Sequence, residues 1–369
     1  MRILINFSNI KIGGGIQVAL SFIGQLSNFT SKHTFHVVVS DQIFEKIPSN
    51  IFSDKSIVVY RYTIKPTIIK ALFGKDSFLN KVLIDNKCVK AFTLFGPSYW
   101  RPIVPHLVGF ARPHYVYKDS PIFMRIGFNE RIFWLLSEII HMYSFKHHCD
   151  SLVSENEDVS TKLSFRLKKP VYTVSNTFHQ VFDDEYLWLV PEIDFEDNTK
   201  YVLTISANYA HKNLSIIPKI IEELLNRNIF NVKFILTINK GEFLSSEILD
   251  EYIIYLGSIP IEKCPLLYRN SDFVFLPSLL ECFSATYVEA MKMGKALITS
   301  DLPFAKGICK NAAFYVDPLD PTCITEGIIY LLSNQSSVNS LIENGYKRLS
   351  TFLSPESRAQ KYIDLLESI

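Results

Sequence analysis

Residues 273–300 constrain the fold of this chain more than any other stretch. They begin with an apolar run, 273–276, that is long enough for one buried strand. Residues 285–293 then place apolar side chains at helical spacing, and Gly294 suits the left-handed position at which helices often end. A second apolar run follows at 295–299. This strand–loop–helix–strand order is the building block of a parallel sheet covered by helices, so an α/β fold is predicted.

The loop and helix of this stretch also predict a ligand site. In parallel sheets, ligands bind at the carboxyl ends of strands, beside helix N-termini whose N–H groups attract anions. Two acids flank this point, Glu281 in the loop and Glu289 inside the helix. Ser284 or Thr286 is the expected cap of the helix.

The same residues resemble a known family. The order P-S-x-x-E-x-F-x-x-x-x-x-E-A-M-x-x-G over residues 277–294 resembles the donor-site signature of retaining glycosyltransferases of family 4. That family usually has glycine on both sides of the phenylalanine, where this chain has Cys282 and Ser284. The resemblance continues through residues 300–304 and 312–318. It implies two facing doubly wound, Rossmann-like α/β domains, the GT-B architecture, with a donor cleft between them.

The length of the chain agrees with two domains, because 369 residues are more than one hydrophobic core usually contains. The acidic, irregular residues 183–199 are the expected linker. We predict an N-terminal acceptor-binding domain over 1–190 and a C-terminal nucleotide-sugar donor domain over 191–354. By resemblance, residues 355–369 form a helix that packs back on the first domain. Neither a transmembrane run nor a signal peptide is predicted, so a cytoplasmic protein is expected.

Charge is divided unevenly along the chain. Residues 1–190 hold 22 lysines and arginines against 15 acids, and residues 191–369 hold 16 against 22. A basic first half suits an anionic partner such as a lipid diphosphate or a membrane surface, and solvated surface charge is the plainer alternative. Residues 65–90 mix lysines with apolar residues, which predicts either an interfacial membrane element or an ordinary crossover helix. Nucleic acid is not expected, because the basic residues form no compact cluster with aromatic residues.

The resemblance implies roles for residues of the C-terminal half. Lys212 lies in a loop similar to the family's phosphate loop and is the expected cation for the departing diphosphate. Glu289 is expected on the ribose hydroxyls and Glu281 near the donor sugar. The backbone at Ile259 is expected to contact the base, which leaves UDP and GDP open. The other expected donor-site residues are Phe283, Ser284, Ala285, Thr286 and Asn213.

Each of these charged residues also has an ordinary structural interpretation. Lys212 could be a solvated lysine at a helix start, Glu281 a surface acid of a loop, and Glu289 a helix acid that interacts with the macrodipole. The spacing of the two glutamates favours the functional interpretation.

In the N-terminal half, the clearest feature is a loop with three glycines, Gly13, Gly14 and Gly15, between a strand and a helix. It departs from the Rossmann dinucleotide pattern because Val18 occupies the third glycine position. Such a loop is most often a tight turn, and the resemblance places it near the donor phosphates and the acceptor. His114 is the expected histidine of the reaction site, with His106 close in sequence.

The predicted activity is therefore metal-independent, retaining transfer of a sugar from a UDP- or GDP-linked donor to a glycan. No cofactor is expected, and no metal ligands are assigned. The resemblance implies a lipid-linked acceptor in bacterial surface-polysaccharide assembly, reached from the inner face of the cytoplasmic membrane. Two alternatives stay open: a sugar-nucleotide epimerase or phosphorylase on the same architecture, and a non-catalytic nucleotide-sugar-binding protein.

Overall fold

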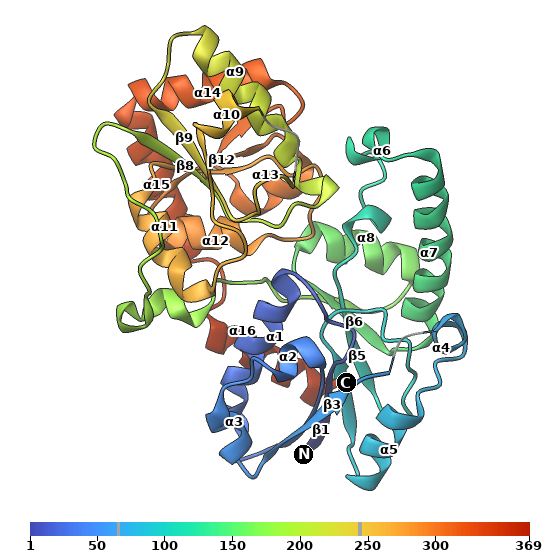
Figure 1. Cartoon of the computed structure of the whole chain (residues 1–369). Coiled ribbons are helices and arrows are strands. Elements are labelled where there is room, and N and C mark those ends of the chain that lie inside the picture. Colours follow the sequence, from blue (N-terminus) through green and yellow to red (C-terminus); the bar gives the residue numbers. More distant parts are fainter. Residues whose placement is uncertain (65–66, 243–245) are drawn as a thin grey trace. The chain divides into compact units, whose positions relative to one another are not determined.

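The computed structural model describes residues 1–64, 67–242 and 246–369, which form two compact units (Figure 1). Unit 1 contains residues 1–119, 123–179 and 353–369, and unit 2 contains residues 120–122 and 180–352. The division at residues 179 and 180 comes earlier than position 190. The reason is local packing, because Phe182 lies against the ring of Tyr268 and Asp183 pairs with Lys292, all within unit 2.

Unit 1 is built on a seven-stranded parallel sheet in the order β3-β2-β1-β4-β5-β6-β7. Its strands are β1 (Arg2–Phe7), β2 (Thr34–Ser40), β3 (Ile57–Tyr62), β4 (Lys90–Thr93), β5 (His106–Phe110), β6 (Ser151–Ser154) and β7 (Val171–Thr173). The strand order reverses between β1 and β4. The loops after these two strands therefore lie at a topological switch point, the usual place for a ligand.

The helices of unit 1 connect these strands. They are α1 (Gly14–Gln25), α2 (Asp41–Phe44), α3 (Ser49–Ser53), α4 (Ile68–Phe73), α5 (Ser77–Asp85), α7 (Phe128–His147), α8 (Glu157–Leu167) and α16 (Pro355–Ser368), with 3-10 turns at Leu26–Phe29 and Pro113–Tyr115. Helix α6 (Ile122–Arg125) starts in unit 2 and ends in unit 1.

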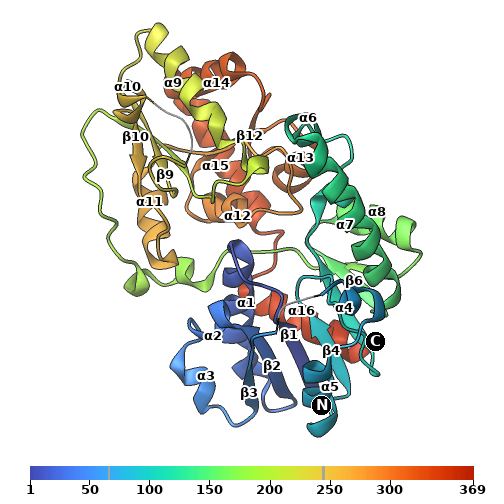
Figure 2. The ribbon, with the colours of Figure 1, turned by 45° about the vertical axis from the view of Figure 1, so that its right-hand side comes forward.

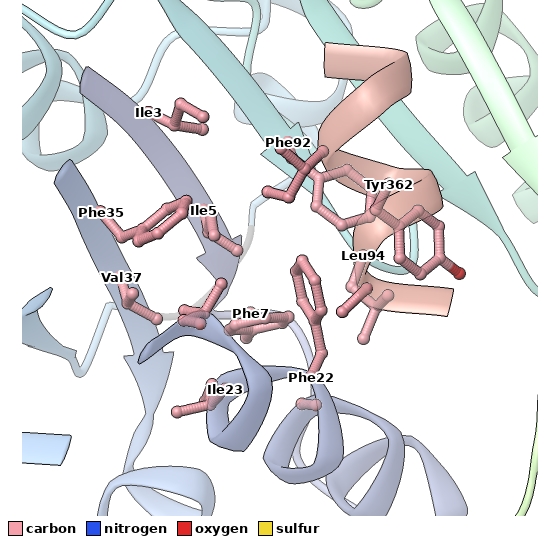
Figure 3. Packing of buried hydrophobic residues seen from close by; sticks show 14 of the residues in the cluster. Ile3, Ile5, Phe7, Phe22, Ile23, Phe35, Val37, Phe92, Leu94 and Tyr362 are labelled. Atoms are coloured by element: carbon pink, nitrogen blue, oxygen red, sulfur yellow. The ribbon is translucent and has the colours of Figure 1, made fainter. Parts of the chain in front are cut away.

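The last helix, α16, completes the core of unit 1 (Figure 3). The ring of Tyr362 lies 5.4 Å from that of Phe22 on α1 and 5.0 Å from that of Phe92 on β4. Arg358, also on α16, is 2% exposed and donates hydrogen bonds to Asn176 and Ser21. Aromatic packing and a buried cation thus hold the end of the chain in the first unit.

Unit 2 is built on a six-stranded parallel sheet in the order β10-β9-β8-β11-β12-β13. Its strands are β8 (Lys200–Thr204), β9 (Val232–Leu236), β10 (Ile253–Tyr255), β11 (Phe273–Leu276), β12 (Ala296–Ser300) and β13 (Phe314–Val316). Its α-helices are α9 (Ile217–Asn226), α10 (Glu247–Asp250), α11 (Cys264–Asn270), α12 (Ala285–Lys292), α13 (Pro303–Cys309), α14 (Pro321–Ser333) and α15 (Gln335–Leu349). Its 3-10 turns are Gln180–Asp183, Glu185–Leu187, Ala210–Lys212, Leu214–Ile216 and Ile261–Lys263.

Both faces of this sheet are covered by helices (Figure 2). Consecutive strand residues such as Val274 and Phe275 are fully buried, which requires cover on both sides. The chain passes from β8 to β9 in one direction and from β11 to β12 in the other. Right-handed crossovers then place α9 and α12 on opposite faces, and β8 and β11 meet at the switch point.

The prediction of two doubly wound parallel α/β domains is confirmed. Two local predictions were wrong. Ser284 occupies the N-cap position of α12 but makes no side-chain capping bond, and Thr286 donates instead to the carbonyl of Ile205. The element expected over residues 65–90 is two helices, because Gly74 ends α4 in the left-handed conformation and Asp76 caps α5. Residues 65 and 66 of that element lie outside the described ranges.

Candidate functional site in unit 2

The candidate site lies where the loops after β8 and β11 meet at the switch point of unit 2. The N–H of Leu279, in the loop after β11, donates to the carbonyl of His211, in the loop after β8, at 2.7 Å. The Thr286 hydroxyl contacts the Ile205 carbonyl at 3.3 Å and adds a second link between the loops. Two neighbouring parallel strands thus hold residues that are distant in sequence at one edge of the sheet.

Lys212 and Glu281 form an ion pair at this edge. The Lys212 ammonium donates to Oε1 of Glu281, and the Ser278 hydroxyl donates to the same oxygen at 2.9 Å. The side chains are only 14% and 9% exposed, so neither residue is the solvated surface charge that the sequence left open. The fold has brought one cation and one carboxylate into a nearly buried contact.

The first turn of α12 begins beside this pair. Ser284 is buried, with an extended backbone, and leads into the helix at Ala285. Because Ser284 supplies no side-chain cap, the N-terminal N–H groups of α12 are suited to an anionic ligand. Phe283 is 9% exposed and packs edge-on against Phe352, with ring centroids 5.8 Å apart.

Asn213 stabilises the conformation of the loop that follows β8. Its φ of 57° is left-handed, a conformation that asparagine tolerates better than most residues. Its side-chain amide donates to the carbonyl of Pro318 at 2.7 Å. Asn213 therefore fastens the loop that carries Lys212 to the segment after β13.

Glu289 lies in α12 and is buried against α11. The hydroxyl of Tyr268 donates to Oε2 of Glu289 at 2.8 Å. Burial raises the pKa of Glu289 to about 7, because the charged form is poorly solvated there, and the hydrogen bond from Tyr268 offsets only part of this effect. Ile259, predicted near the base, is half-buried in the segment after β10.

Sequence reasoning missed Ser278, His211 and Tyr268. The rings of His211 and Tyr209 stack with an interplanar angle of 11°, and burial lowers the pKa of His211 while Glu281 acts to raise it. No spacing rule points to His211 or to Tyr268, whose partner Glu289 lies on another helix. Ser278 alone had a signal, because it precedes Glu281 in the family-like order.

The predicted glycine loop lies at the switch point of unit 1. Gly13 has a φ of 71° and is the N-cap of α1, which explains a glycine there. A Cβ atom at Gly14 meets no atom within 4 Å, whereas one at Gly15 lies 3.2 Å from Ile10. The Asn9 amide donates to the carbonyl of Phe95 and so links the loop after β1 with the loop after β4.

The two histidines considered for the reaction site have different surroundings in unit 1. His106 is 1% exposed, and its ring nitrogens contact Thr93 and the carbonyl of His148. Burial lowers the pKa of His106 to about 4. His114 is half-buried in the turn after β5, with its ring 4.1 Å from that of Tyr115 and 4.8 Å from that of Trp134. Of the two, only His114 has access to a ligand.

Among residues 1–64, 67–242 and 246–369, no three His, Cys, Asp or Glu side chains are grouped so that they could hold a metal ion. None of the helices within these ranges is long and apolar enough to span a bilayer.

The sequence of unit 2 matches a known family model. Residues 190–348 match the family described as glycosyl transferases group 1. The O-antigen chain mannosyltransferase RfbU of Salmonella typhimurium is 25% identical over 181 residues, which cover 43% of this chain and 50% of that protein. The chain matches half or less of the length of its curated relatives.

Solved structures share the fold of the whole chain. The glycosyltransferase WaaG, involved in lipopolysaccharide biosynthesis, has a TM-score of 0.71 at 12% identity, covering 99% of each chain. Anabaena Alr3699/HepE in complex with UDP and glucose has a TM-score of 0.69 at 15% identity, covering 100% of each chain. The paired glutamates, the loops of the candidate site and the family match all fall in unit 2, where residues 190–348 are similar to the group 1 glycosyl transferases.

Proposed function

We propose that this chain is a retaining glycosyltransferase that moves a sugar from a UDP- or GDP-linked donor to a glycan acceptor. The observation that carries the proposal is the Lys212–Glu281 pair beside the N-terminus of α12, inside the region that matches the glycosyl transferase family. A cation and a helix N-terminus together suit a diphosphate.

The donor diphosphate takes Lys212 as its cationic partner in this proposal. During transfer, the bond between the anomeric carbon and the phosphate oxygen breaks, and the acceptor hydroxyl oxygen forms the new bond on the same face of the sugar. The acceptor proton passes to the departing diphosphate. Lys212 and the N–H groups at Ala285 and Thr286 stabilise the negative charge that develops on the leaving group. Glu281 binds the donor sugar, and Glu289 accepts hydrogen bonds from the ribose.

The acceptor class is inferred from the relatives. RfbU is named as an O-antigen chain mannosyltransferase, and WaaG is involved in lipopolysaccharide biosynthesis. We therefore propose a lipid-linked saccharide acceptor, bound through residues 1–190, and a reaction at the inner face of the cytoplasmic membrane. The basic balance of that half suits a lipid diphosphate.

Turnover with a panel of UDP- and GDP-sugars tests the proposal. Release of nucleoside diphosphate is measured with lipid-linked saccharide acceptors, and the anomeric configuration of the product is determined by NMR. Lys212→Ala should lower kcat/KM by about 100- to 1,000-fold, the effect of removing one donor that stabilises developing negative charge. The matched control is Lys219→Ala, an exposed lysine on α9 of the same unit, which should behave as wild type.

Three results would count against parts of this proposal. Near-normal turnover of Lys212→Ala would remove the lysine from the mechanism. An inverted anomeric centre would reject retention. Loss of turnover in EDTA that added Mg²⁺ or Mn²⁺ restores would reject metal independence.

A further inference from the structure

Helix α7 presents an apolar face to solvent. Its residues Phe128, Ile132, Leu135, Leu136, Ile139 and Tyr143 recur every three or four positions and lie along one side of the helix. All six are exposed, with Phe128 at 75%, Leu136 at 56% and Ile139 at 60%. A surface helix normally turns such a stripe toward the core. Here a different side of α7, which carries Met142 and Phe145, is the buried one.

The apolar surface extends beyond one helix. Helix α4 contacts α7, and Figures 1 and 2 both show α4 beside one end of α7. Leu72 and Phe73 on α4 are 39% and 65% exposed. The α7 face, defined here as the six apolar residues of α7 together with Leu72 and Phe73, is thus broader than the narrow seam of a two-helix coiled coil.

The charges around the α7 face are positive. Arg131 lies near the start of the helix and Lys146 near its end, and both are exposed. The acids of α7 are Glu130 and Glu138. Glu138 is buried and pairs with Lys118 and Arg166, while Glu130 precedes Ile132 by two positions and so points to another side of the helix. The face therefore combines exposed apolar side chains with flanking cations.

We propose that the α7 face lies in the interfacial region of an anionic lipid bilayer, with the helix axis parallel to the membrane plane. Apolar residues on one face and cations at its margins are the pattern by which interfacial helices bind anionic lipids. A helix of 20 residues gives a contact about 30 Å long. This attachment stands on the exposed surface alone and does not rest on the proposed reaction.

A second copy of the chain fits this face less well. Cations flank the apolar stripe at both ends of α7, so both parallel and antiparallel pairing bring like charges together. The headgroups of an anionic bilayer, in contrast, attract the cations at both ends of α7.

Vesicle flotation tests the proposal directly. The full chain is floated with vesicles of phosphatidylcholine, and with vesicles that also contain phosphatidylglycerol. The test variant is Leu135→Ser/Leu136→Ser/Ile139→Ser. The matched control is Phe230→Ser/Ile248→Ser, which removes apolar side chains of unit 2 that are 58% and 65% exposed.

Wild type and the control should float with the anionic vesicles, and the α7 variant should bind at least about tenfold more weakly. Equal melting temperatures of the three proteins establish that folding is retained. Equal flotation of the α7 variant and wild type would overturn the proposal. So would a wild-type dimer in light scattering that the α7 variant converts to a monomer without any vesicle binding by wild type.

Discussion

Replacement of Lys212 by alanine should destabilise unit 2 in the absence of any ligand. The change leaves Glu281, whose side chain is 9% exposed, with Ser278 as its remaining hydrogen-bond donor. Removing one partner of a buried ion pair costs about 3–5 kcal/mol, because the other charge stays buried without compensation. Since Lys212 is itself 14% exposed, water can enter the vacated space, and we expect a cost of about 3 kcal/mol.

This prediction is measured by a double-mutant cycle. Thermal unfolding is followed for wild type, Lys212→Ala, Glu281→Gln and the double variant. A loss of about 3 kcal/mol in a domain of this size lowers the melting temperature by roughly 6–12 °C. The double variant should be close in stability to Glu281→Gln alone, because the carboxylate that suffers from the loss of lysine is then absent. The expected coupling between the two residues is therefore about 3 kcal/mol, the cost of Lys212→Ala itself.

Two outcomes would refute this reasoning. If the two single changes add without coupling, Lys212 and Glu281 do not share a buried contact. If Lys212→Ala and Lys219→Ala both melt at the wild-type temperature, the Lys212–Glu281 pair contributes nothing to the stability of unit 2. Its two charges are then as well solvated as those of a surface lysine and a surface acid.

Three further predictions follow from single positions. Burial raises the pKa of Glu289 to about 7, so the folded state holds the proton of this carboxyl group more tightly than the unfolded state does. The free energy of unfolding should therefore fall by up to about 3 kcal/mol as pH rises from about 4.5 to 7. Urea titrations of Glu289→Gln should show a weaker pH dependence. Gly109→Ala places a Cβ atom 1.5 Å from the carbonyl oxygen of Leu94 and should cost more than about 4 kcal/mol, whereas Gly14→Ala, with no atom within 4 Å of the added Cβ, should fold as wild type does by circular dichroism. Tyr362→Ala removes a buried ring from between α1 and β4 and should cost about 3–5 kcal/mol in the unfolding of unit 1.

Each of these has a result that would contradict it. A pH dependence equal in wild type and Glu289→Gln would mean that this carboxyl group is not the one that titrates. Soluble, stable Gly109→Ala protein would show that β5 can move away from the loop after β4. Unit 1 that keeps its stability without the Tyr362 ring would show that α16 is not part of its core.

The strands and the fold class were predictable because buried parallel strands are short apolar runs with clear ends. The strand at Phe273–Leu276 matches its predicted bounds. The amphipathic element over 65–90 was mistaken, because the lysine spacing looked continuous while Gly74 and Asp76 break the helix between them. A local stop signal therefore outweighed a longer periodic pattern.

The loop and helix that carry the candidate site were predictable, but the contacts within the site were not. The spacing of Glu281 and Glu289 pointed to the loop and helix after β11, yet Lys212 is 69 residues from Glu281 in sequence. Only the parallel pairing of β8 and β11 brings the two loops together. The partner of Glu289, Tyr268, comes from the preceding helix and has no spacing signal.

The sequence did not predict the exposed apolar face of α7, for a different physical reason. The helix has apolar residues on its buried side, including Met142 and Phe145, and also on its solvent side. Periodicity then shows apolar residues on two sides of the helix and does not reveal which side meets solvent. The burial of each residue in the folded unit supplies that information.

The central claim, a diphosphate site made by Lys212 and the N-terminus of α12, is tested most directly by a crystal structure of the chain with bound UDP or GDP. We predict that the phosphate oxygens lie within hydrogen-bond distance of the Lys212 ammonium and of the N–H groups at Ala285 and Thr286. A nucleotide whose phosphates bind elsewhere, with the Lys212–Glu281 pair untouched, would contradict the account.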